Sequence, residues 1–487
     1  MFEALNLAPK PKTLEAFMQT MTENRLDLDM FPSELIIPSS KWYKLRKLIP
    51  WREIETLLSP LFEESGRNAI PIRHIIGALI VQTDKNLTDR ETVETIMETP
   101  MIQYFLGLDS YIMKPLFDFT LLSKYRKKIG IDKAKEMIDT LLESQKVTKK
   151  KTEDKTHHGS MSIDATAVPV NITYPTDVKL LGETRVQTEK LIDEGHKASK
   201  DLTKPRTYRQ KARKDYLNAA KAKRLSNSKR RAALRAQLQY IRRNLKSIET
   251  KLCEGLYHFD EDQFERLETC KTIYEQQKTM YETKTKRHDN RIVNFHQPHI
   301  RCIVRGKTGN PYEFGPKIAV SKVNGFIRLD EISFDNFNES GTVSSLVDRY
   351  KAIHGVYPEA IRADKIYQTR ANKTYCKNLG IRLSGKPLGR PKKDKDEQEE
   401  KRIMEADFKK RQEIEGVFGV AKTKYGLSKL MTKLPESQKA SIGLVFFVMN
   451  LHQLLSLTLF SNPLETHFLP IDNNEIEYVF EEERPRF

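Results

Sequence analysis

The sequence predicts an α/β protein in which an all-α N-terminal domain precedes the strands and a basic helical hairpin interrupts them. Three observations support this prediction. Residues 1–150 carry repeated helix-start signals and apolar positions at helical spacing. Residues 158–184 and 296–460 alternate short strand-like runs with helices, and the basic residues 185–290 lie between them. The length of 487 residues allows two to four such units.

The charge of the chain favours a polyanionic partner. Lys and Arg number 84 against 66 for Asp and Glu, which gives a formal net charge of +18. Such an excess is typical of proteins that bind nucleic acid, and a membrane surface is the weaker alternative. A simply basic protein, such as a ribosomal one, is also compatible with the charge alone.

The cysteines and the apolar segments indicate a protein of a reducing cytoplasm. The four cysteines are scattered without C-x-x-C spacing, which argues against a structural zinc site and a disulfide framework. The N-terminus MFEALNLAPKPK lacks the charged-then-apolar pattern of a signal peptide. The apolar run 442–460 contains Asn450, His452 and Gln453 and is barely of spanning length, so we expect a buried helix of a soluble protein.

Helix-start signals recur through the N-terminal domain. Ser or Thr before an apolar run, and Pro at the first helical position, are typical of helix N-termini. These signals occur at Ser39–Ser40, Pro50–Glu53, Pro71–Ile72, Leu87–Asp89 and Phe117–Thr120. Compact helices with basic ends suit DNA-end binding or dimerisation, and a plain helical bundle is the alternative.

The first strand is expected at Met161–Val170, after a charged linker at residues 147–158. Alternation puts Ser162, Asp164 and Thr166 on one face of this strand and apolar residues on the other. A single Asp on a strand is more often a surface residue than a ligand. Asp164 is therefore a candidate ligand only in combination with other acidic residues elsewhere in the chain.

Nearly the whole excess charge lies in residues 197–251, where 19 Lys or Arg face three acidic residues, so that 19 − 3 gives +16. The apolar positions at steps of 4, 3, 4, 3 and 4 are Leu234, Leu238, Ile241, Leu245, Ile248 and Leu252. Such steps form a seam that packs on a partner helix, and the acidic, aromatic segment Phe259–Tyr281 is a credible return helix. We therefore predict a helical hairpin between the first and second strands.

Two basic segments are candidates for DNA contact. In the hairpin the candidates for phosphate binding are Arg224, Arg230, Arg231, Arg235, Arg242 and Arg243, although charge runs are often solvated faces. In the irregular residues 384–400, Arg390 is flanked by Lys392 and Lys393, and an extended basic peptide of this kind fits a DNA minor groove. A solvated linker is the competing interpretation of that segment.

Strand and helix signals alternate after the hairpin. The expected strands are His299–Arg305, Phe314–Val323, Phe326–Phe334, Ala360–Tyr367 and Ile381–Leu383. Asn324–Gly325 between two of them is a strong hairpin signal. Helices are expected at Gly341–His354 and Thr369–Leu379, so Asp364 lies on the strand between two helices.

The helix that follows carries the most informative pattern. Phe408, Arg411, Glu415, Phe418 and Lys422 fall at steps of 3, 4, 3 and 4, so they share one helical face. An ordinary amphipathic helix would place aliphatic residues along such a stripe. A Glu at its centre is costly to bury unless something cationic or metallic meets it.

Three carboxylates from two strands and one helix suggest a metal site. Asp164, Asp364 and Glu415 would supply the hard oxygen ligands that Mg²⁺ prefers. Paired ions about 3.5–4 Å apart stabilise the attacking and leaving oxygens of phosphoryl transfer. Taken alone, Glu415 beside Arg411 is also compatible with an i, i+4 ion pair worth about 0.3–0.5 kcal/mol.

With these residues the chain resembles the DDE transposases of bacterial insertion sequences, in the group with a Tyr-Arg-Glu-Lys signature on the last catalytic helix. The signature runs Tyr, two residues, Arg, three residues, Glu, six residues, Lys. Arg411, Glu415 and Lys422 match this spacing. Phe408 stands where Tyr is usual, which removes a hydroxyl and keeps an aromatic face.

The resemblance implies a ribonuclease-H-like catalytic core made of residues 158–184 and 296–460. In that fold the first and fourth strands are neighbours, which would bring Asp164 and Asp364 together. The N-terminal domain would then bind DNA ends or dimerise, and the acidic residues 461–487 would form a peripheral tail.

The implied reaction is hydrolysis of a phosphodiester bond at each transposon end, followed by attack of the freed 3′-hydroxyl on target DNA. Asp164 would bridge two Mg²⁺ ions, with Mn²⁺ as a possible substitute, and Asp364 and Glu415 would each hold one. Arg411 and Lys422 would grip phosphates near the cut.

Phe408 and Phe418 are candidates for stacking on a displaced base, with core packing as the alternative for Phe418. The expected partners are terminal inverted repeats, target DNA and a second copy of the chain, in the nucleoid of a bacterial cytoplasm. A nuclease with the same core, or a transposase-derived DNA-binding protein without catalysis, are the alternatives.

Overall fold

The computed structural model describes most of the chain. The described residues are 31, 33–62, 70–145, 156–199, 203–304, 311–385 and 397–461. The sequence predictions that lie outside them concern Arg390, Lys392, Lys393, residues 147–155 of the charged linker, the turn at 306–310 and the acidic tail from residue 462.

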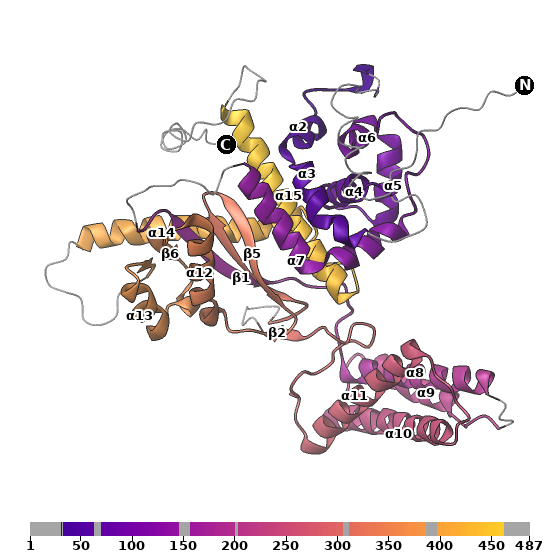
Figure 1. Ribbon diagram of the computed structural model, residues 1–487. Coiled ribbons are helices and arrows are strands. Elements are labelled where there is room, and N and C mark those ends of the chain that lie inside the picture. Colours follow the sequence, from indigo (N-terminus) through magenta and orange to yellow (C-terminus); the bar gives the residue numbers. More distant parts are fainter. Residues whose placement is uncertain are drawn as a thin grey trace, which may run out of the picture.

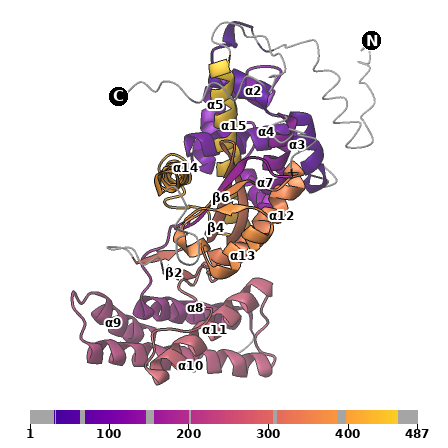
Figure 2. The same ribbon diagram turned by 90° about the vertical axis from the view of Figure 1, so that its left-hand side faces the viewer.

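The described residues form a body around a β-sheet and a separate all-helical unit, drawn below the body in Figure 1. The helical unit is inserted between the first and second strands of the chain, as the sequence predicted. Figure 2, turned by 90°, shows the same separation, with the helices of the unit running across the underside of the body. The molecule is mostly helical and of mixed α/β class.

The N-terminal helices begin where the sequence predicted, except for the helix that starts at Pro100, which was not predicted. They are α2 (Lys41–Leu48), α3 (Trp51–Leu58), α4 (Ile72–Lys85), α5 (Asp89–Glu98), α6 (Pro100–Leu106) and α7 (Thr120–Ser144). The Ser40 hydroxyl accepts a hydrogen bond from the Trp42 amide and caps α2. Thr88 and Glu91 form a reciprocal capping box at the start of α5. Because such caps join neighbours in sequence, they can be predicted locally.

Helix α15 (Pro435–Ser461) joins the N-terminal helices to the sheet. It packs against α2, α4 and α7 and also against β5. It is the one helix of the described chain that is long and apolar enough to span a membrane, but 67% of its apolar window is buried inside the body. The prediction of a buried helix is confirmed. The N-terminal helices and one part of the sheet therefore share an apolar core, and a second apolar core of the body contains Ile163, Val347 and Ile361.

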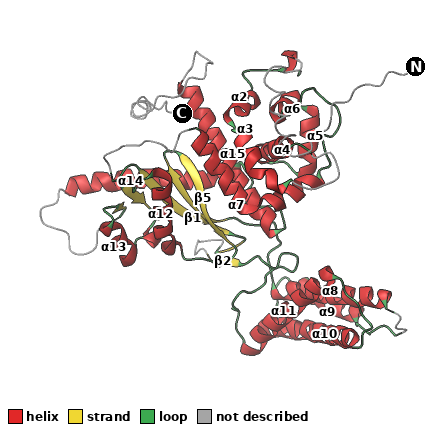
Figure 3. Ribbon diagram, viewed as in Figure 1, coloured by secondary structure: helices red, strands yellow, loops and turns green. Residues whose placement is uncertain are grey.

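The central sheet has five strands (Figure 3). They are β1 (Ser160–Ala167), β4 (Lys317–Val323), β5 (Phe326–Ser333), β6 (Ala360–Arg362) and β7 (Arg382–Leu383), in the order β5-β4-β1-β6-β7. β4 is antiparallel to β1 and β5, whereas β6 is parallel to β1 and β7 is parallel to β6. β4 and β5 turn at Asn324–Gly325, as predicted, and both residues have positive φ.

Two strand predictions are corrected by the structure. Within residues 299–304, the described part of the predicted strand His299–Arg305, the structure forms β2 (Cys302–Val304), which pairs with β3 (Tyr312–Phe314) in a separate two-stranded sheet. The predicted strand Phe314–Val323 is broken after β3. Gly315 adopts a φ of +153°, and a Cβ there would lie 2.0 Å from the carbonyl oxygen of Val168, so only glycine fits.

The predicted strand Ala360–Tyr367 is also shorter than expected. It ends at Arg362, and Asp364 caps the 3₁₀ turn η4 (Lys365–Tyr367) that follows. The remaining elements of the body are η3 (Glu339–Thr342), α12 (Val343–His354), α13 (Arg370–Asn378) and α14 (Glu397–Thr423).

The insertion contains four helices instead of the two of a hairpin. They are α8 (Asp177–Ala198), α9 (Arg209–Ala220), α10 (Asn227–Cys253) and α11 (Glu261–Thr283). The predicted pair corresponds to α10 and α11. The sequence did not reveal α9 because that helix is basic and buries only Ala212, so it lacks an apolar stripe.

The predicted seam on α10 is the inner face of this four-helix unit. Leu238, Ile241, Leu245 and Ile248 are buried in an apolar core that also contains residues of α8 and α11. Leu234 and Leu252, the two ends of the seam, are only partly buried. The insertion thus has a core of its own, separate from that of the body.

Candidate active site

Asp164 and Asp364 lie on neighbouring strands. Ser162 of β1 pairs in parallel with Arg362 of β6, and each aspartate lies two residues beyond this pair. Neighbouring strands are about 4.8 Å apart, so Asp164, within β1, and Asp364, just past β6, lie side by side at the edge of the sheet where β6 ends. The sequence order alone could not establish this, because 200 residues separate them and the parallel pairing is a tertiary feature.

Glu415 comes to the same edge on α14, which contacts both β1 and β6. The buried face of α14 carries Ile414, Val417 and Ala421, whereas the Glu415 side chain is half exposed beside it. Helix packing on the two aspartate-bearing strands thus brings the third predicted carboxylate to the first two.

Arg411 lies between two of these carboxylates. Its Nη1 atom is 3.6 Å from Asp364 Oδ1 and 3.2 Å from Glu415 Oε1. The single positive charge of the guanidinium therefore offsets part of the negative charge of these two acids. The ring of Phe408, which is 53% exposed, lies 5.5 Å from the Arg411 guanidinium carbon.

Asp407 fixes α14 on the sheet, a role the sequence did not reveal. Its carboxylate accepts hydrogen bonds from Arg362 Nε at 3.0 Å and Arg382 Nη2 at 2.9 Å. These arginines belong to β6 and β7, so one buried carboxylate joins the helix to two strands. No local signal identifies Asp407, because both partners are distant in sequence.

Asp164 is the carboxylate of this group without a cation partner among the described residues. Its Oδ1 atom accepts a hydrogen bond from the Ala165 amide at 2.8 Å. Burial raises the pKa of Asp164 to about 6, and the negative charges of Glu339, Asp364 and Glu415 contribute. The charges of three other acidic residues thus contribute to the raised pKa of Asp164. One of them, Glu339, was not among the site residues predicted from the sequence.

The acidic group fits a hard divalent cation by its chemistry, because carboxylate oxygens are the ligands that Mg²⁺ prefers. Within the part of the chain that the structure describes, no three His, Cys, Asp or Glu residues are already close enough to hold a metal ion. Arg411 occupies the space between Asp364 and Glu415. Binding of a metal would therefore require Arg411 to leave and the carboxylates to approach each other.

The other residues of the predicted helical stripe have different surroundings. Lys422 Nζ donates a hydrogen bond to Thr166 Oγ1 on β1 at 3.1 Å, so this lysine of α14 contacts the strand that carries Asp164. Phe418 is buried in the core of the body. Of the two interpretations of Phe418, core packing is confirmed and stacking on a base is wrong, because the ring is buried.

The basic candidates of the insertion lie mainly on its outside. The exposed ones are Arg224, Arg230, Arg235, Arg242 and Arg243. Arg231 differs because its Nη1 atom donates to the Tyr281 carbonyl at 3.0 Å and its guanidinium covers the Tyr281 ring at 4.0 Å. This contact ties α10 to α11 and argues against Arg231 as a DNA ligand.

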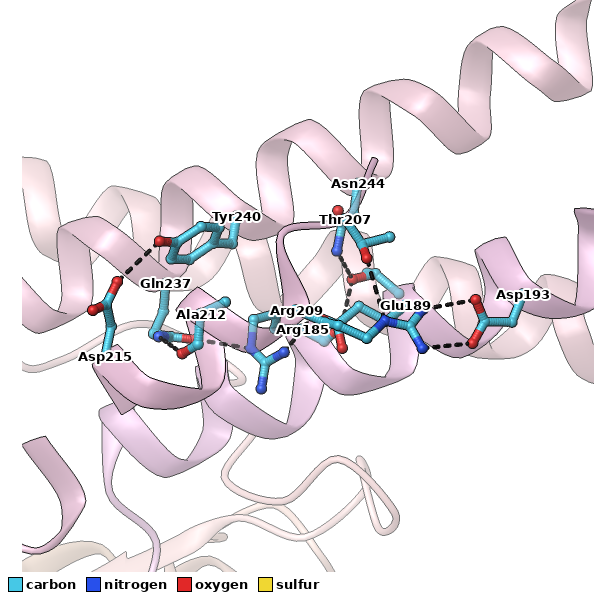
Figure 4. Close-up of polar contacts among 11 residues, drawn as sticks. Arg185, Glu189, Asp193, Thr207, Arg209, Ala212, Asp215, Gln237, Tyr240 and Asn244 are labelled. Carbon is cyan, nitrogen blue, oxygen red and sulfur yellow. Dashed lines mark hydrogen bonds and ion pairs between the residues drawn. The ribbon is translucent and has the colours of Figure 1, made fainter. Parts of the chain in front are cut away.

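A polar network inside the insertion orients these helices (Figure 4). Arg185 and Glu189 form a buried ion pair on α8, and Arg185 Nε donates to Gln237 Oε1 on α10 at 3.2 Å. Gln237 in turn donates to the Ala212 carbonyl on α9 at 3.1 Å. Three helices are thereby fixed to one another, and the arginines on the outer face of α10 gain a defined direction.

Two family models match separate parts of the chain. Residues 361–452, which include Asp364, Arg411, Glu415 and Lys422, match the Transposase DDE domain. Residues 32–128 match the Transposase domain (DUF772). The chain is related to the DDE transposases of insertion sequences. Asp164 and the helical insertion lie outside both matched ranges.

The similarity of the chain to an individual curated protein is weak. The chain is similar to the "Uncharacterized protein ORF8 in nfe locus" of Rhizobium meliloti, with 23% identity over 171 residues. That alignment covers 35% of this chain and 79% of the relative. No solved structure matches the chain significantly.

Proposed function

We propose that this protein is a transposase that cuts phosphodiester bonds at insertion-sequence ends and joins the freed 3′-hydroxyl to target DNA. The observation that carries the proposal is that β1, the turn after β6, and α14 bear Asp164, Asp364 and Glu415 on neighbouring elements of one sheet edge, in a chain that matches two transposase domains. The strand order β5-β4-β1-β6-β7 supports a ribonuclease-H-like core, because the fourth strand of this sheet in chain order neighbours the first.

Each acidic residue has a role that its position supports. Asp164 is assigned as the ligand shared by two Mg²⁺ or Mn²⁺ ions, because it is the carboxylate without a cation partner in the described structure. Asp364 and Glu415 would each hold one ion. When bound, such ions activate the attacking water or 3′-hydroxyl and stabilise the leaving oxygen.

In the proposed reaction, Arg411 leaves its carboxylate partners, Asp364 and Glu415, and binds a DNA phosphate. Its planar guanidinium can bind a phosphate through two parallel hydrogen bonds, whereas Lys422 acts as a point charge beside β1. The exposed ring of Phe408 next to Arg411 is available for stacking on a base near the cut. These three residues would hold the scissile strand against the acidic edge.

Double-stranded DNA is the proposed substrate. The bound DNA would extend from the sheet edge to other parts of the protein. The exposed arginines of α10 would bind the phosphates of the terminal inverted repeat, at a distance from the acidic site. The N-terminal helices would bind DNA ends or join two copies of the chain. We expect a homodimer on DNA, because two transposon ends must be joined in concert.

The proposal is tested by incubating the full-length protein with labelled candidate terminal repeats, target DNA and Mg²⁺. Cleavage followed by joining is expected. Cleavage without joining would indicate a nuclease with the same core. Binding without cleavage would indicate a DNA-binding protein that has lost catalysis.

A further inference from the structure

We propose that the loop between α14 and α15, residues 424–434, binds the phosphate backbone of double-stranded DNA between the acidic sheet edge and the helical insertion. This segment is called the basic loop below. The inference rests on the proposed function and adds a contact surface to it. No residue of the basic loop is among the site residues predicted from the sequence.

The basic loop is a positively charged surface. It contains Lys424, Lys429 and Lys433 and no Asp or Glu. All three lysines are exposed, and none of them forms an ion pair with a residue that the structure describes. Surface cations without acidic partners attract polyanions, and a lysine binds a phosphate as a point charge. The charge of the loop therefore fits the DNA backbone, whose contacts do not depend on base sequence.

Buried residues of the basic loop fix its backbone. Tyr425, Leu427 and Leu430 are buried in the apolar core of the body. Gly426 has a φ of +75°, and a Cβ at this position would clash with the Asn86 side chain of the N-terminal domain. Because these buried residues alternate with the lysines, the backbone is held in place while the ammonium groups remain on the surface.

The basic loop starts beside the acidic edge. Lys422, in the last turn of α14, donates a hydrogen bond to Thr166 on β1. Further along the loop, the Leu430 amide donates to the Pro169 carbonyl at 2.8 Å, and the Asn171 amide donates to the Leu430 carbonyl at 2.9 Å. The loop thus accompanies the chain as it leaves β1 toward α8, the first helix of the insertion.

The chain that returns from the insertion is connected to the same loop. Gln438 is buried in the first turn of α15, and its Nε2 atom donates to the Thr432 carbonyl of the loop and to Gln297 Oε1, both at 2.8 Å. Its Oε1 atom accepts a hydrogen bond from His299 Nε2 at 3.0 Å. Gln297 and His299 lie between α11 and β2, so both connections of the insertion are joined to the basic loop. In Figure 1 the start of α15 lies on the side of the body nearest the insertion.

This position determines which partner the three lysines meet. The proposed function places one part of the DNA at the acidic edge and another part on the exposed arginines of α10. A duplex that spans these two surfaces passes the connections of the insertion, where the basic loop lies. Because the acidic edge repels phosphates, cations beside it lower the free-energy cost of bringing DNA there.

The test is the affinity of the full-length protein for a random-sequence duplex, measured by fluorescence anisotropy in EDTA at several salt concentrations. Replacement of Lys424, Lys429 and Lys433 by Ala should lower this affinity by roughly tenfold or more. The plot of log affinity against log salt concentration should flatten by about 0.9 for each lost phosphate contact, or roughly 3 in total. If the triple variant does not fold, Lys429→Ala alone should flatten the slope by about 0.9.

Two controls separate DNA contact from a general effect of charge. Replacement of the same three lysines by Arg keeps the charge and should keep both the affinity and the salt slope. Lys351→Ala with Lys377→Ala removes two exposed lysines from α12 and α13, which pack on the opposite face of β1. This double variant should bind DNA like the unmodified protein. An equal loss per removed charge in the double variant and the triple Ala variant would overturn the inference.

Replacement of Arg230, Arg235 and Arg242 of α10 by Ala separates this inference from the function on which it rests. If the α10 variant binds DNA more weakly and the folded triple Ala variant of the basic loop does not, the loop is not a DNA-binding surface and the proposed function stands. If the unmodified protein binds no duplex DNA, the proposed function is wrong and the inference fails with it.

Discussion

The body and the helical insertion of this protein differ in the sign and the position of their charged side chains. At the sheet edge of the body, negative groups gather, and the cations Arg411 and Lys317 offset only part of their charge. In the insertion, the buried charges of Arg185 and Glu189 balance each other, and the positive excess is left on the outside of α10.

This difference indicates that the body and the insertion have different roles. An acidic edge is suited to metal ions and to chemistry on phosphates, whereas an exposed basic helix is suited to the long-range attraction of DNA. The apolar core of the insertion is separate from the two apolar cores of the body, so changes in one unit need not disturb the folding of the other. The predictions below test this separation, from the largest expected effect to the smallest.

Glu415→Gln should remove cutting and spare DNA binding. Loss of a carboxylate ligand is expected to slow cleavage by at least roughly 1,000-fold, equivalent to about 4 kcal/mol of transition-state stabilisation. Single-turnover cleavage of a labelled terminal repeat measures this rate. Glu413→Gln is the control on the same helix, since Glu413 pairs with Lys322 at 2.9 Å and should be dispensable. A fully active Glu415→Gln protein would refute the assignment of Glu415.

Arg185→Met should unfold the insertion more easily and leave the body intact. It removes one partner of a buried pair, which typically costs about 3–5 kcal/mol because the other charge remains buried. Urea denaturation followed by limited proteolysis of the insertion measures the loss. The double variant Arg185→Met with Glu189→Leu should recover much of it. Equal destabilisation of body and insertion would show that the two cores are coupled.

Removing the exposed cations of α10 should weaken DNA binding and leave the acidic edge unchanged. Triple replacement of Arg230, Arg235 and Arg242 by Ala is expected to lower affinity for a terminal-repeat duplex by roughly tenfold or more, and the salt dependence should flatten by about one unit of slope per lost phosphate contact. Fluorescence anisotropy at several salt concentrations measures both quantities. Arg231→Ala should instead lower stability, because Arg231 is bound to Tyr281. An unchanged salt slope in the triple variant would give α10 a structural role.

The stability of the metal-free body should depend on pH through Asp164. The pKa of Asp164 is raised from 3.8 to about 6, so the folded protein holds a proton that the unfolded chain has lost over this range. The free energy of unfolding should therefore fall as pH rises from 4 to 6, by about 1–3 kcal/mol from this group. Denaturation in EDTA at several pH values measures the effect. Asp164→Asn should flatten this part of the profile, and an identical profile in both proteins would contradict the assignment.

Local signals in the sequence determined much of the architecture. Helix starts at Ser40 and Thr88 depend on bonds to residues two or three positions away, and the Asn324–Gly325 turn depends on two residues that accept positive φ. The apolar seam of α10 and the spacing of Arg411 and Glu415 likewise follow from helical geometry. These features depend on residues that are close together in the sequence, so the sequence alone predicts them.

Only the tertiary structure decided how those elements meet. The parallel pairing of β1 with β6 brings Asp164 beside Asp364, and the rotation of α14 on the sheet buries Phe418 while leaving Glu415 half exposed. The pairing of Lys317 with Glu339 depends on the fold in the same way. These groups are brought together by strand register and helix packing between distant segments, and no spacing within one segment encodes that.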